Sequence, residues 1–239
     1  MIDRHIAKLR ARADISAREE EAIRSAVSGY RDHAADQTIV AAYVEQDHSL
    51  LLIDGIMCRY KDLRGGQRQI TQLHVAGDFP DLHSFTLKYL DHEVMTLTPC
   101  RVAVVPHDNL RRMTEQFPRL TRLYWFSTNM DAATHREWEL SLGRRSARAR
   151  VAMLLSELHI RFQIVGLADE TGYDLPLTQT DLGESTGLTN VHVNRTLREL
   201  RESGLVEFQA GRVAILDREG LWQAGEFDPR YLYLDRQDR

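Results

Sequence analysis

Cysteine, lysine and long apolar stretches are all scarce in this sequence of 239 residues. Its two cysteines, Cys58 and Cys100, are too few for a disulfide framework or a metal cluster built from several cysteines. The longest apolar runs, 50–53 and 102–105, fall far short of the roughly 18 residues that span a bilayer. Residues 1–10 are charged and lack the apolar core of a secretory signal. We therefore expect a soluble, cytoplasmic protein.

Only Lys8, Lys61 and Lys88 are lysines among the 31 basic residues, so arginine carries nearly all the positive charge. Arginine presents a planar fork that suits phosphates and guanine edges, and lysine cannot copy it. The same bias also arises in genomes rich in guanine and cytosine. The net charge of −4 argues mildly against a nucleic-acid partner, since such modules are usually basic. Composition alone therefore leaves nucleic-acid binding open.

The N-terminal half begins with a helical pattern and continues with short strands. Ser16 and Glu19 form a capping box that opens the helix. The apolar positions that follow at helical spacing are Ala22, Ile23, Ala26, Val27 and Tyr30. Asp54-Gly55 and Gly65-Gly66 are hairpin turns between the predicted strands, which are 38–44, 49–53, 56–60, 69–75, 93–98 and 101–105. Their even spacing predicts a small β-barrel or sandwich.

A long helix is predicted from Arg119 to about Leu142, after the breaker Phe117-Pro118. Apolar residues recur along it at alternating spacings of three and four, interrupted only by Glu137, which is the narrow seam of a coiled coil. The seam consists of Leu123, Phe126, Met130, Ala133 and Leu140. A second identical chain is the simplest partner for it. The alternative is that this stripe packs on the chain's own strands.

Residues 178 to 203 hold two short helices separated by a glycine turn. Thr178 caps the first helix, and Asp181 complements the helix dipole. Gly183 lies where the two helices must approach closely, and Gly187 ends the first helix in a turn that a side chain would strain. Thr189 then caps the second helix. This order is the pattern of a helix-turn-helix.

The second of these helices has one buried and one polar stripe. Val193, Leu197 and Leu200 are predicted to face inward, against Leu182 and Leu188. The residues left facing outward are Asn190, Val191, Asn194, Arg195 and Arg198. A β-hairpin wing is predicted next, with strands 205–208 and 212–216 joined at Ala210-Gly211. Arg212 near its tip is expected to contact phosphate, which positions a protein on DNA without specifying sequence.

The chain resembles the Crp/Fnr family of dimeric bacterial transcription regulators over essentially its whole length. The matching residues are Gly77-Asp78-Phe79, Phe117-Pro118 and the stretch LTQTDLGESTGLTNVHVNRTLRELRESGLV at 177–206. The resemblance implies an α+β fold with a cyclic-nucleotide-binding-like β-roll, a long dimerisation helix and a C-terminal winged helix-turn-helix. It also implies a homodimer on a palindromic operator, with RNA polymerase as a further partner. We assign a sensor domain to 1–118, the dimerisation helix and hinge to 119–143, and the DNA-binding domain to 144–239.

The resemblance also assigns roles to residues of the second helix. Arg195 matches the family arginine that reaches a base edge, where its fork spans guanine O6 and N7. Val191 stands where the family typically has glutamate, and Asn190 stands where the cAMP receptor protein has arginine, so the operator is expected to differ. His192 is either an adaptor to DNA or merely faces solvent. The candidate DNA contacts are Thr189, Asn190, Val191, His192, Asn194, Arg195, Arg198 and Arg212.

The arginine cluster beyond Gly143 has two interpretations. Its members either contact backbone phosphates or pair with acids such as Glu137 and Glu139. They are Arg144, Arg145, Arg148 and Arg150.

No cofactor is predicted for the β-roll. In the cyclic-nucleotide branch of the family, the phosphate cassette holds a glutamate for the ribose and an arginine for the phosphate. Here 80–82 (Pro-Asp-Leu) replaces the glycine and glutamate, and Asp91 near the arginine's place would repel phosphate. Lys88 would replace the missing phosphate-binding arginine only if other residues positioned its side chain. Cyclic nucleotides are therefore not expected.

Other effectors receive little support from the sequence. The iron–sulfur branch needs N-terminal cysteines, and none precedes Cys58. Haem remains an alternative because His74, His83 and His92 fall in one region of the roll. Cys58 and Cys100 are expected to be small core side chains rather than thiol sensors. A regulator without any small ligand is a further alternative.

An enzyme is not expected, because the sequence contains no G-x-S-x-G, H-E-x-x-H, G-x-x-x-x-G-K or G-x-G-x-x-G motif. Asp47-His48-Ser49 contains the residue types of a triad, but neighbours on a strand point to opposite faces. The alternative to a regulator is an effector-binding or protein-interaction module whose helix-turn-helix does not bind DNA. The outward amides and arginines argue against it, since a protein interface favours apolar anchors.

Overall fold

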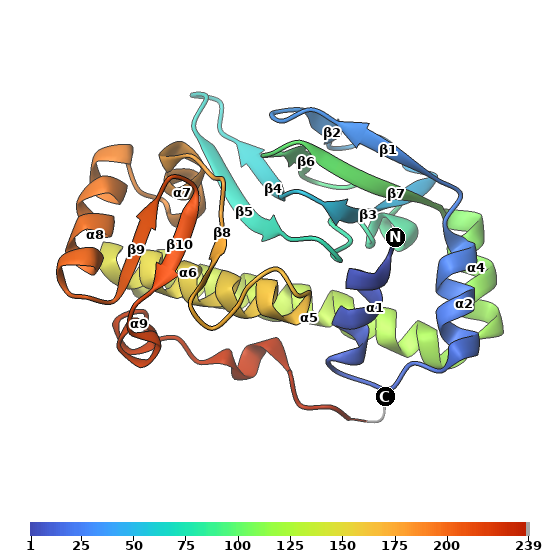
Figure 1. The fold of residues 1–239 in the computed structure, drawn as a ribbon. Helices are drawn as coiled ribbons and strands as arrows, with labels where there is room; N and C mark the ends of the chain where they lie inside the picture. The colour runs from blue at the N-terminus through green and yellow to red at the C-terminus, as the bar shows by residue number, and fades with distance from the viewer. Residues whose placement is uncertain (238–239) are drawn as a thin grey trace. The chain divides into compact units, whose positions relative to one another are not determined.

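The computed structural model describes residues 1–237, and their packing separates them into two units (Figure 1). The first unit contains 1–61, 72–132 and the chain from Tyr233 onward. The second contains 62–71 and 133–232. The long helix α5 (Pro118–Arg144) belongs in part to each, because the division falls between Ala132 and Ala133.

Two sheets lie mainly in the first unit, although 68–71, at the start of one strand, belong to the second. One has the strand order β1-β7-β3, and the other has the order β2-β6-β4-β5. The bounds are β1 Gly29–His33, β2 Thr38–Val40, β3 His48–Asp54, β4 Met57–Asp62, β5 Arg68–His74, β6 Glu93–Thr96 and β7 Cys100–Pro106. The six predicted strands are confirmed with shifted ends, and with them the α+β class.

Strand β1 was missed by the sequence analysis, which continued the preceding helix to Tyr30. Helix α2 (Ala17–Ala26) ends because Val27 adopts an extended conformation, with φ −74° and ψ 126°. The five residues of β1 are at most half-buried, so they carry no apolar alternation that would identify a strand.

Strands β3 and β7 are buried on both faces of their sheet. Leu50 and Leu52 of β3 pack with Val102 and Val104 of β7 toward the other sheet. The alternate residues pack against α1 (Asp3–Arg10), α2, α4 (His107–Gln116) and α5, and they are Leu51, Ala103 and Val105. This alternation follows from the period of two in a strand. Each fully buried leucine contributes roughly 1.5–3 kcal/mol. The short helix α3 (Ser84–Leu87) lies between β5 and β6.

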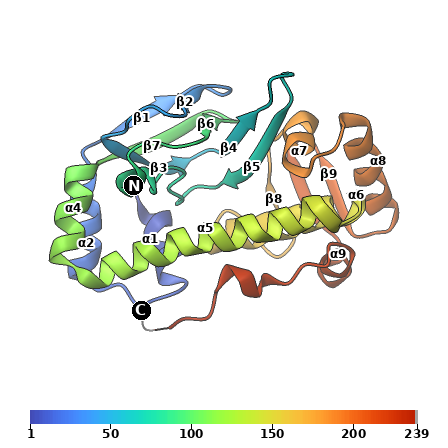
Figure 2. The ribbon, with the colours of Figure 1, turned by 180° about the vertical axis from the view of Figure 1, so that it is seen from behind.

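The apolar seam predicted along α5 faces mainly into the chain itself. Leu123 is 1% exposed and belongs to the core of the first unit, and Met130 and Ala133 are also buried. Phe126 is half-buried, with its ring centroid 6.1 Å from that of Tyr233. Leu140 is exposed. The prediction was wrong for Leu123, Met130 and Ala133, because the chain itself buries them; at Leu123 the first half of α5 packs beside α1 (Figure 2).

The second unit combines helices with a small sheet of order β8-β10-β9. Its elements are α6 Ala147–Ile164, β8 Gly172–Asp174, α7 Gln179–Thr186, α8 Asn190–Glu202, β9 Val206–Gln209, β10 Arg212–Ile215, α9 Arg218–Ala224 and the 3₁₀ turn Pro229–Leu232. The predicted hinge residue Gly143 lies inside α5, and 233–237 pack with the first unit rather than with the predicted domain 144–239. No helix within residues 1–237 is long and apolar enough to cross a membrane.

Candidate nucleic-acid interface

The local turns of the helix-turn-helix form as the sequence predicts. Thr178 Oγ1 accepts a hydrogen bond from the Asp181 amide at 3.1 Å, and the Asp181 carboxylate accepts one from the Thr178 amide at 2.7 Å. Gly187 ends α7 with φ +65°. A Cβ on Gly183 would lie 2.6 Å from the carbonyl oxygen of Leu188, so only glycine permits this close approach.

Helix α8 buries a row slightly different from the predicted one. Thr189 caps the helix, accepting from the His192 amide at 3.4 Å. Val193, Thr196 and Leu200 are buried, whereas Leu197 is only half-buried. The predicted inward position of Leu197 was wrong, because it lines the groove between α8 and the wing.

The predicted DNA contacts on α8 are all exposed. Val191 is 76% exposed, so its side chain is fully accessible to a partner. The others that face solvent from this helix and its cap are Thr189, Asn190, His192, Asn194, Arg195 and Arg198. The polar and apolar faces of α8 are therefore separated as an interface to DNA requires.

A groove of about 790 Å³ runs between α8, the start of α7 and the wing. Predicted contacts in its lining are Val191, Asn194, Arg195 and Arg198. Gln179, Arg201 and Phe208 also line it, although the sequence did not predict them as site residues. The wing turns at Ala210 and Gly211, both with positive φ.

The arginines of this surface are held only by weak, exposed ion pairs. Arg195 Nε lies 3.6 Å from Glu199, and Arg198 Nε lies 3.8 Å from Glu202. Arg212 Nη1 lies 3.1 Å from Asp174. Such pairs contribute at most about 1 kcal/mol. The guanidinium groups can therefore exchange these partners for DNA at little cost.

Two amides of α8 bond to the start of α7. Asn194 and Gln179 each donate to the other's carbonyl oxygen. Asn190 Nδ2 donates to Thr180 Oγ1 at 3.1 Å. No sequence signal pointed to Gln179, because the partners are fifteen residues apart.

The arginine side chains near the start of α6 bond mainly to other groups of the same chain. Arg145 is buried, and its Nη2 donates to Glu137 at 2.6 Å and to the Glu226 carbonyl at 2.9 Å. Arg150 donates to the carbonyl oxygens of Arg145 and Thr186, at 3.0 and 3.2 Å. Pairing with an acid is thus the arrangement found for Arg145.

A cluster of polar and charged side chains lies inside the first unit, around Arg59. Arg59 on β4 is 2% exposed. Its guanidinium donates to Gln72 Oε1 at 2.7 Å, to Asp131 of α5 at 2.9 Å and to the Pro80 carbonyl at 2.5 Å. The Pro80 carbonyl lies in the stretch that corresponds to the phosphate cassette.

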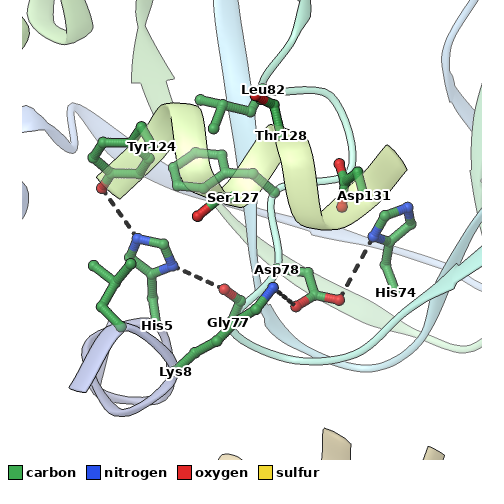
Figure 3. Close-up of a pocket in the computed structure, with 12 residues that line it drawn as sticks. His5, Lys8, His74, Gly77, Asp78, Leu82, Tyr124, Ser127, Thr128 and Asp131 are labelled. Carbon is green, nitrogen blue, oxygen red and sulfur yellow. Dashed lines mark hydrogen bonds and ion pairs between the residues drawn. The ribbon is translucent and has the colours of Figure 1, made fainter. Parts of the chain in front are cut away.

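A cavity of about 30 Å³ remains between α1, the 74–79 segment and α5 (Figure 3). His5 Nδ1 bonds to the Gly77 carbonyl at 2.8 Å, so this nitrogen carries the proton, and Nε2 accepts from the Tyr124 hydroxyl at 3.1 Å. Lys8 forms an ion pair with Asp78. A cavity of this size holds about two water molecules.

These residues do not fit a cyclic nucleotide. The cavity is much too small for one, and Asp81 is buried, accepting from the Leu50 amide at 2.8 Å. Asp91 pairs with Lys61 at 2.9 Å, while the exposed Lys88 donates to the Phe85 carbonyl at 3.3 Å.

The histidines and cysteines of the first unit lie among its own side chains. His83 and His92 stack with ring centroids 5.2 Å apart, and His74 is buried beside Asp78. Cys58 and Cys100 are buried. Burial raises the pKa of the Cys100 thiol, which disfavours the reactive thiolate.

Comparisons with known proteins agree with this arrangement. Residues 30–117 match the cyclic nucleotide-binding domain, and 149–224 match the Crp-like helix-turn-helix domain. A probable transcriptional activator of Rhizobium leguminosarum bv. viciae is 31% identical over 183 residues, covering 74% of this chain and 73% of that protein. Transcriptional activator protein FnrL of Cereibacter sphaeroides is 25% identical over 201 residues, covering 83% of this chain and 80% of FnrL.

A solved structure shows the same fold over most of the chain. FixK2 from Bradyrhizobium japonicum matches with a TM-score of 0.75 and 25% identity, covering 82% of this chain and 96% of FixK2. The helix-turn-helix, the two domain matches and these relatives agree with one another. The chain therefore belongs to the Crp/Fnr family, whose members are DNA-binding transcription regulators.

Proposed function

We propose that this regulator binds a palindromic operator as a homodimer, with one α8 in each of two successive major grooves. The observation that carries the proposal is the separation of faces on α8. Val193, Thr196 and Leu200 are buried, while Val191 and Arg195 are exposed beside the groove. The half-sites would lie about one helical turn apart, roughly 34–36 Å. The protein would act in the cytoplasm, where the DNA of bacteria lies.

We assign three roles to the exposed side chains of α8 and the wing. Arg195 supplies a fork for guanine O6 and N7, and Val191 supplies an apolar contact for a thymine methyl. Arg198 and Arg201, which line the groove, are proposed to contact phosphates, as is Arg212 in the wing. Thr189, Asn190 and His192 are adaptors at the helix start.

Replacing Arg195 with alanine should weaken binding to the operator by roughly 1–3 kcal/mol and binding to random DNA very little. The reason is that the variant cannot bond to the base, whereas phosphate contacts remain. Arg212→Ala is the matched control, and it should weaken both duplexes about equally. The measurement is titration with operator and scrambled duplex at one fixed salt concentration. Equal weakening on both duplexes for Arg195→Ala would remove Arg195 from base recognition.

The dimer is proposed to form through the exposed face of α5. Arg122, Trp125, Asn129, Ala132 and Arg136 follow one another at alternating spacings of three and four, and all are exposed. Trp125 is the largest apolar side chain among them and is 68% exposed. This face replaces the predicted seam, whose residues Leu123, Met130 and Ala133 are buried. Leu140 and Phe126 of that seam remain accessible at least in part.

A charge at Trp125 should convert the dimer into a monomer. Trp125→Glu places two carboxylates near the proposed twofold axis and removes an apolar anchor. Tyr43→Glu is the control, because Tyr43 lies on the roll and is 69% exposed, almost as much as Trp125. The measurement is the molar mass in solution by light scattering. An unchanged mass for Trp125→Glu would place the dimer contact elsewhere.

The first unit is proposed to respond to something other than a cyclic nucleotide. The Arg59–Asp131 ion pair lies inside this unit, and the cavity between α1, the 74–79 segment and α5 holds about two water molecules. RNA polymerase is the proposed protein partner, as expected for a transcription regulator.

A further inference from the structure

Gln179 and Asn194 form a reciprocal pair of amides across the helix-turn-helix. Gln179 Nε2 donates to Asn194 Oδ1, and Asn194 Nδ2 donates to Gln179 Oε1. Gln179 is the first residue of α7, and Asn194 lies in the second turn of α8. Both side chains are exposed and line the groove beside the wing.

The pair is not needed to satisfy a buried group. Both amides face solvent, where water would provide the same hydrogen bonds. The start of α7 is already capped by Thr178 and Asp181. The bonds therefore matter for where the two amides point, rather than for the stability of the fold.

The pairing uses a particular edge of Asn194. An asparagine amide reads adenine with one edge, donating to N7 and accepting from N6. In the reciprocal pair, this same edge faces Gln179, because one N–H and the carbonyl oxygen are engaged together. Asn194 keeps one further N–H and one oxygen lone pair for single hydrogen bonds. The orientation of one amide also fixes the other, since only opposed donors and acceptors match.

Asn190 offers an internal contrast. The Asn190 amide donates a single hydrogen bond to Thr180 Oγ1 at 3.1 Å, and the carbonyl oxygen of Asn190 takes no part in this bond. Asn190 can therefore exchange one bond for DNA, whereas Asn194 must exchange two at once.

We propose that Gln179 is a positioning residue that determines the base preference of Asn194, by keeping its adenine-reading edge away from the DNA. This inference rests on the proposed function, in which α8 enters the major groove. With Gln179 present, Asn194 contacts DNA through single hydrogen bonds. Without Gln179, the two-pronged edge becomes available to adenine.

Selection of duplexes from a random pool by the full chain tests the proposal, with the wild type, Gln179→Ala, Asn194→Ala and the double variant. Gln179→Ala should gain a preference for adenine at one base pair per half-site, of about fivefold or more. The double variant should lack this gain, because the gain needs the freed Asn194 amide. Titration of matched duplexes that differ at that one base pair gives the ratio. A merely structural role of Gln179 would not change this ratio.

The matched control is Gln223→Ala, which removes an exposed glutamine from α9 and should leave the preference unchanged. A uniform decrease in affinity for Gln179→Ala, with the wild-type base preference, overturns the proposal and makes Gln179 a phosphate contact. A gained preference for adenine that persists in the double variant also overturns the proposal. A wild type that enriches no sequence overturns the proposed function as well, so the two failures are distinguishable.

Discussion

Lowering the pH from 7 to 5 should reduce the free energy of unfolding by about 3 kcal/mol. Three histidines of the first unit are responsible. Burial lowers the pKa of His5 to about 4. Burial, followed by the nearby charge of Arg59, lowers the pKa values of His74 and His83 to about 3.

The direction follows from which state binds protons. In the unfolded chain these histidines take up protons below pH 6.5, while the folded protein resists protonation until about pH 4 or 3. Their stabilising effect is therefore complete above pH 6.5 and decreases as the pH falls. Each histidine contributes a slope of up to about 1.4 kcal/mol per pH unit in this window.

Asp81 acts in the opposite direction. Burial raises its pKa to about 7, although the Leu50 amide that donates to it favours the carboxylate. The folded protein therefore binds a proton near neutral pH that the unfolded chain binds only near pH 4, and this stabilises the fold on acidification. One group of this kind offsets about one histidine, and the net change remains a decrease in stability.

Chemical denaturation across this pH range measures the effect. His5→Gln should flatten the dependence, because one of the three histidines with a lowered pKa is gone. His192→Gln, on the exposed face of α8, is the control and should leave the dependence as it is. A free energy of unfolding that stays constant or rises as the pH falls from 7 to 5 would contradict the assignment of the effect to these histidines.

Replacing Asp131 with alanine should destabilise the first unit by about 3–5 kcal/mol. Arg59 is almost fully buried and would be deprived of its carboxylate partner, at 2.9 Å, while its charge remains. Burial raises the pKa of Asp131, but the nearby positive charges, that of Arg59 first, and the hydrogen bond from Arg59 together outweigh burial and hold the pKa below its usual range. The carboxylate is thus ionised at neutral pH, when the pair is intact.

Two further variants separate this effect from the ordinary effect of truncating a side chain. Asp91→Ala removes an exposed partner of Lys61 and should cost no more than about 1 kcal/mol. Arg59→Met combined with Asp131→Ala should be more stable than Asp131→Ala alone, because no buried charge is left unpaired. Denaturant midpoints measure all three. A cost for Asp131→Ala as small as that for Asp91→Ala would show that Arg59 is solvated.

The helix-turn-helix could be predicted closely because its signals are local. Thr178, Gly187 and Thr189 act on neighbours within a few residues, so their effect is visible in the sequence. The partner that covers the apolar seam of α5 could not be predicted in the same way. An apolar stripe shows that Leu123 and Met130 are buried, but not whether the chain itself or a second copy buries them.

Long-range polar contacts were also invisible in the sequence. Arg59 on a predicted strand gives no sign that its partner is Asp131, 72 residues away. The same holds for Gln179 and Asn194. Side chains that meet only through the tertiary fold need coordinates to be recognised.

The division of the chain has a consequence for the design of truncated fragments. The backbone passes between the two units after Lys61, after Thr71, after Ala132 and after Leu232. A fragment cut at residue 144 would therefore omit 62–71 and 133–143, which pack with the DNA-binding helices. Such a fragment could not form the hydrogen bond from Gln69 to the Glu184 carbonyl of α7, which measures 2.6 Å. A C-terminal fragment expressed alone would therefore contain α7 without the Gln69 side chain that bonds to it in the full chain.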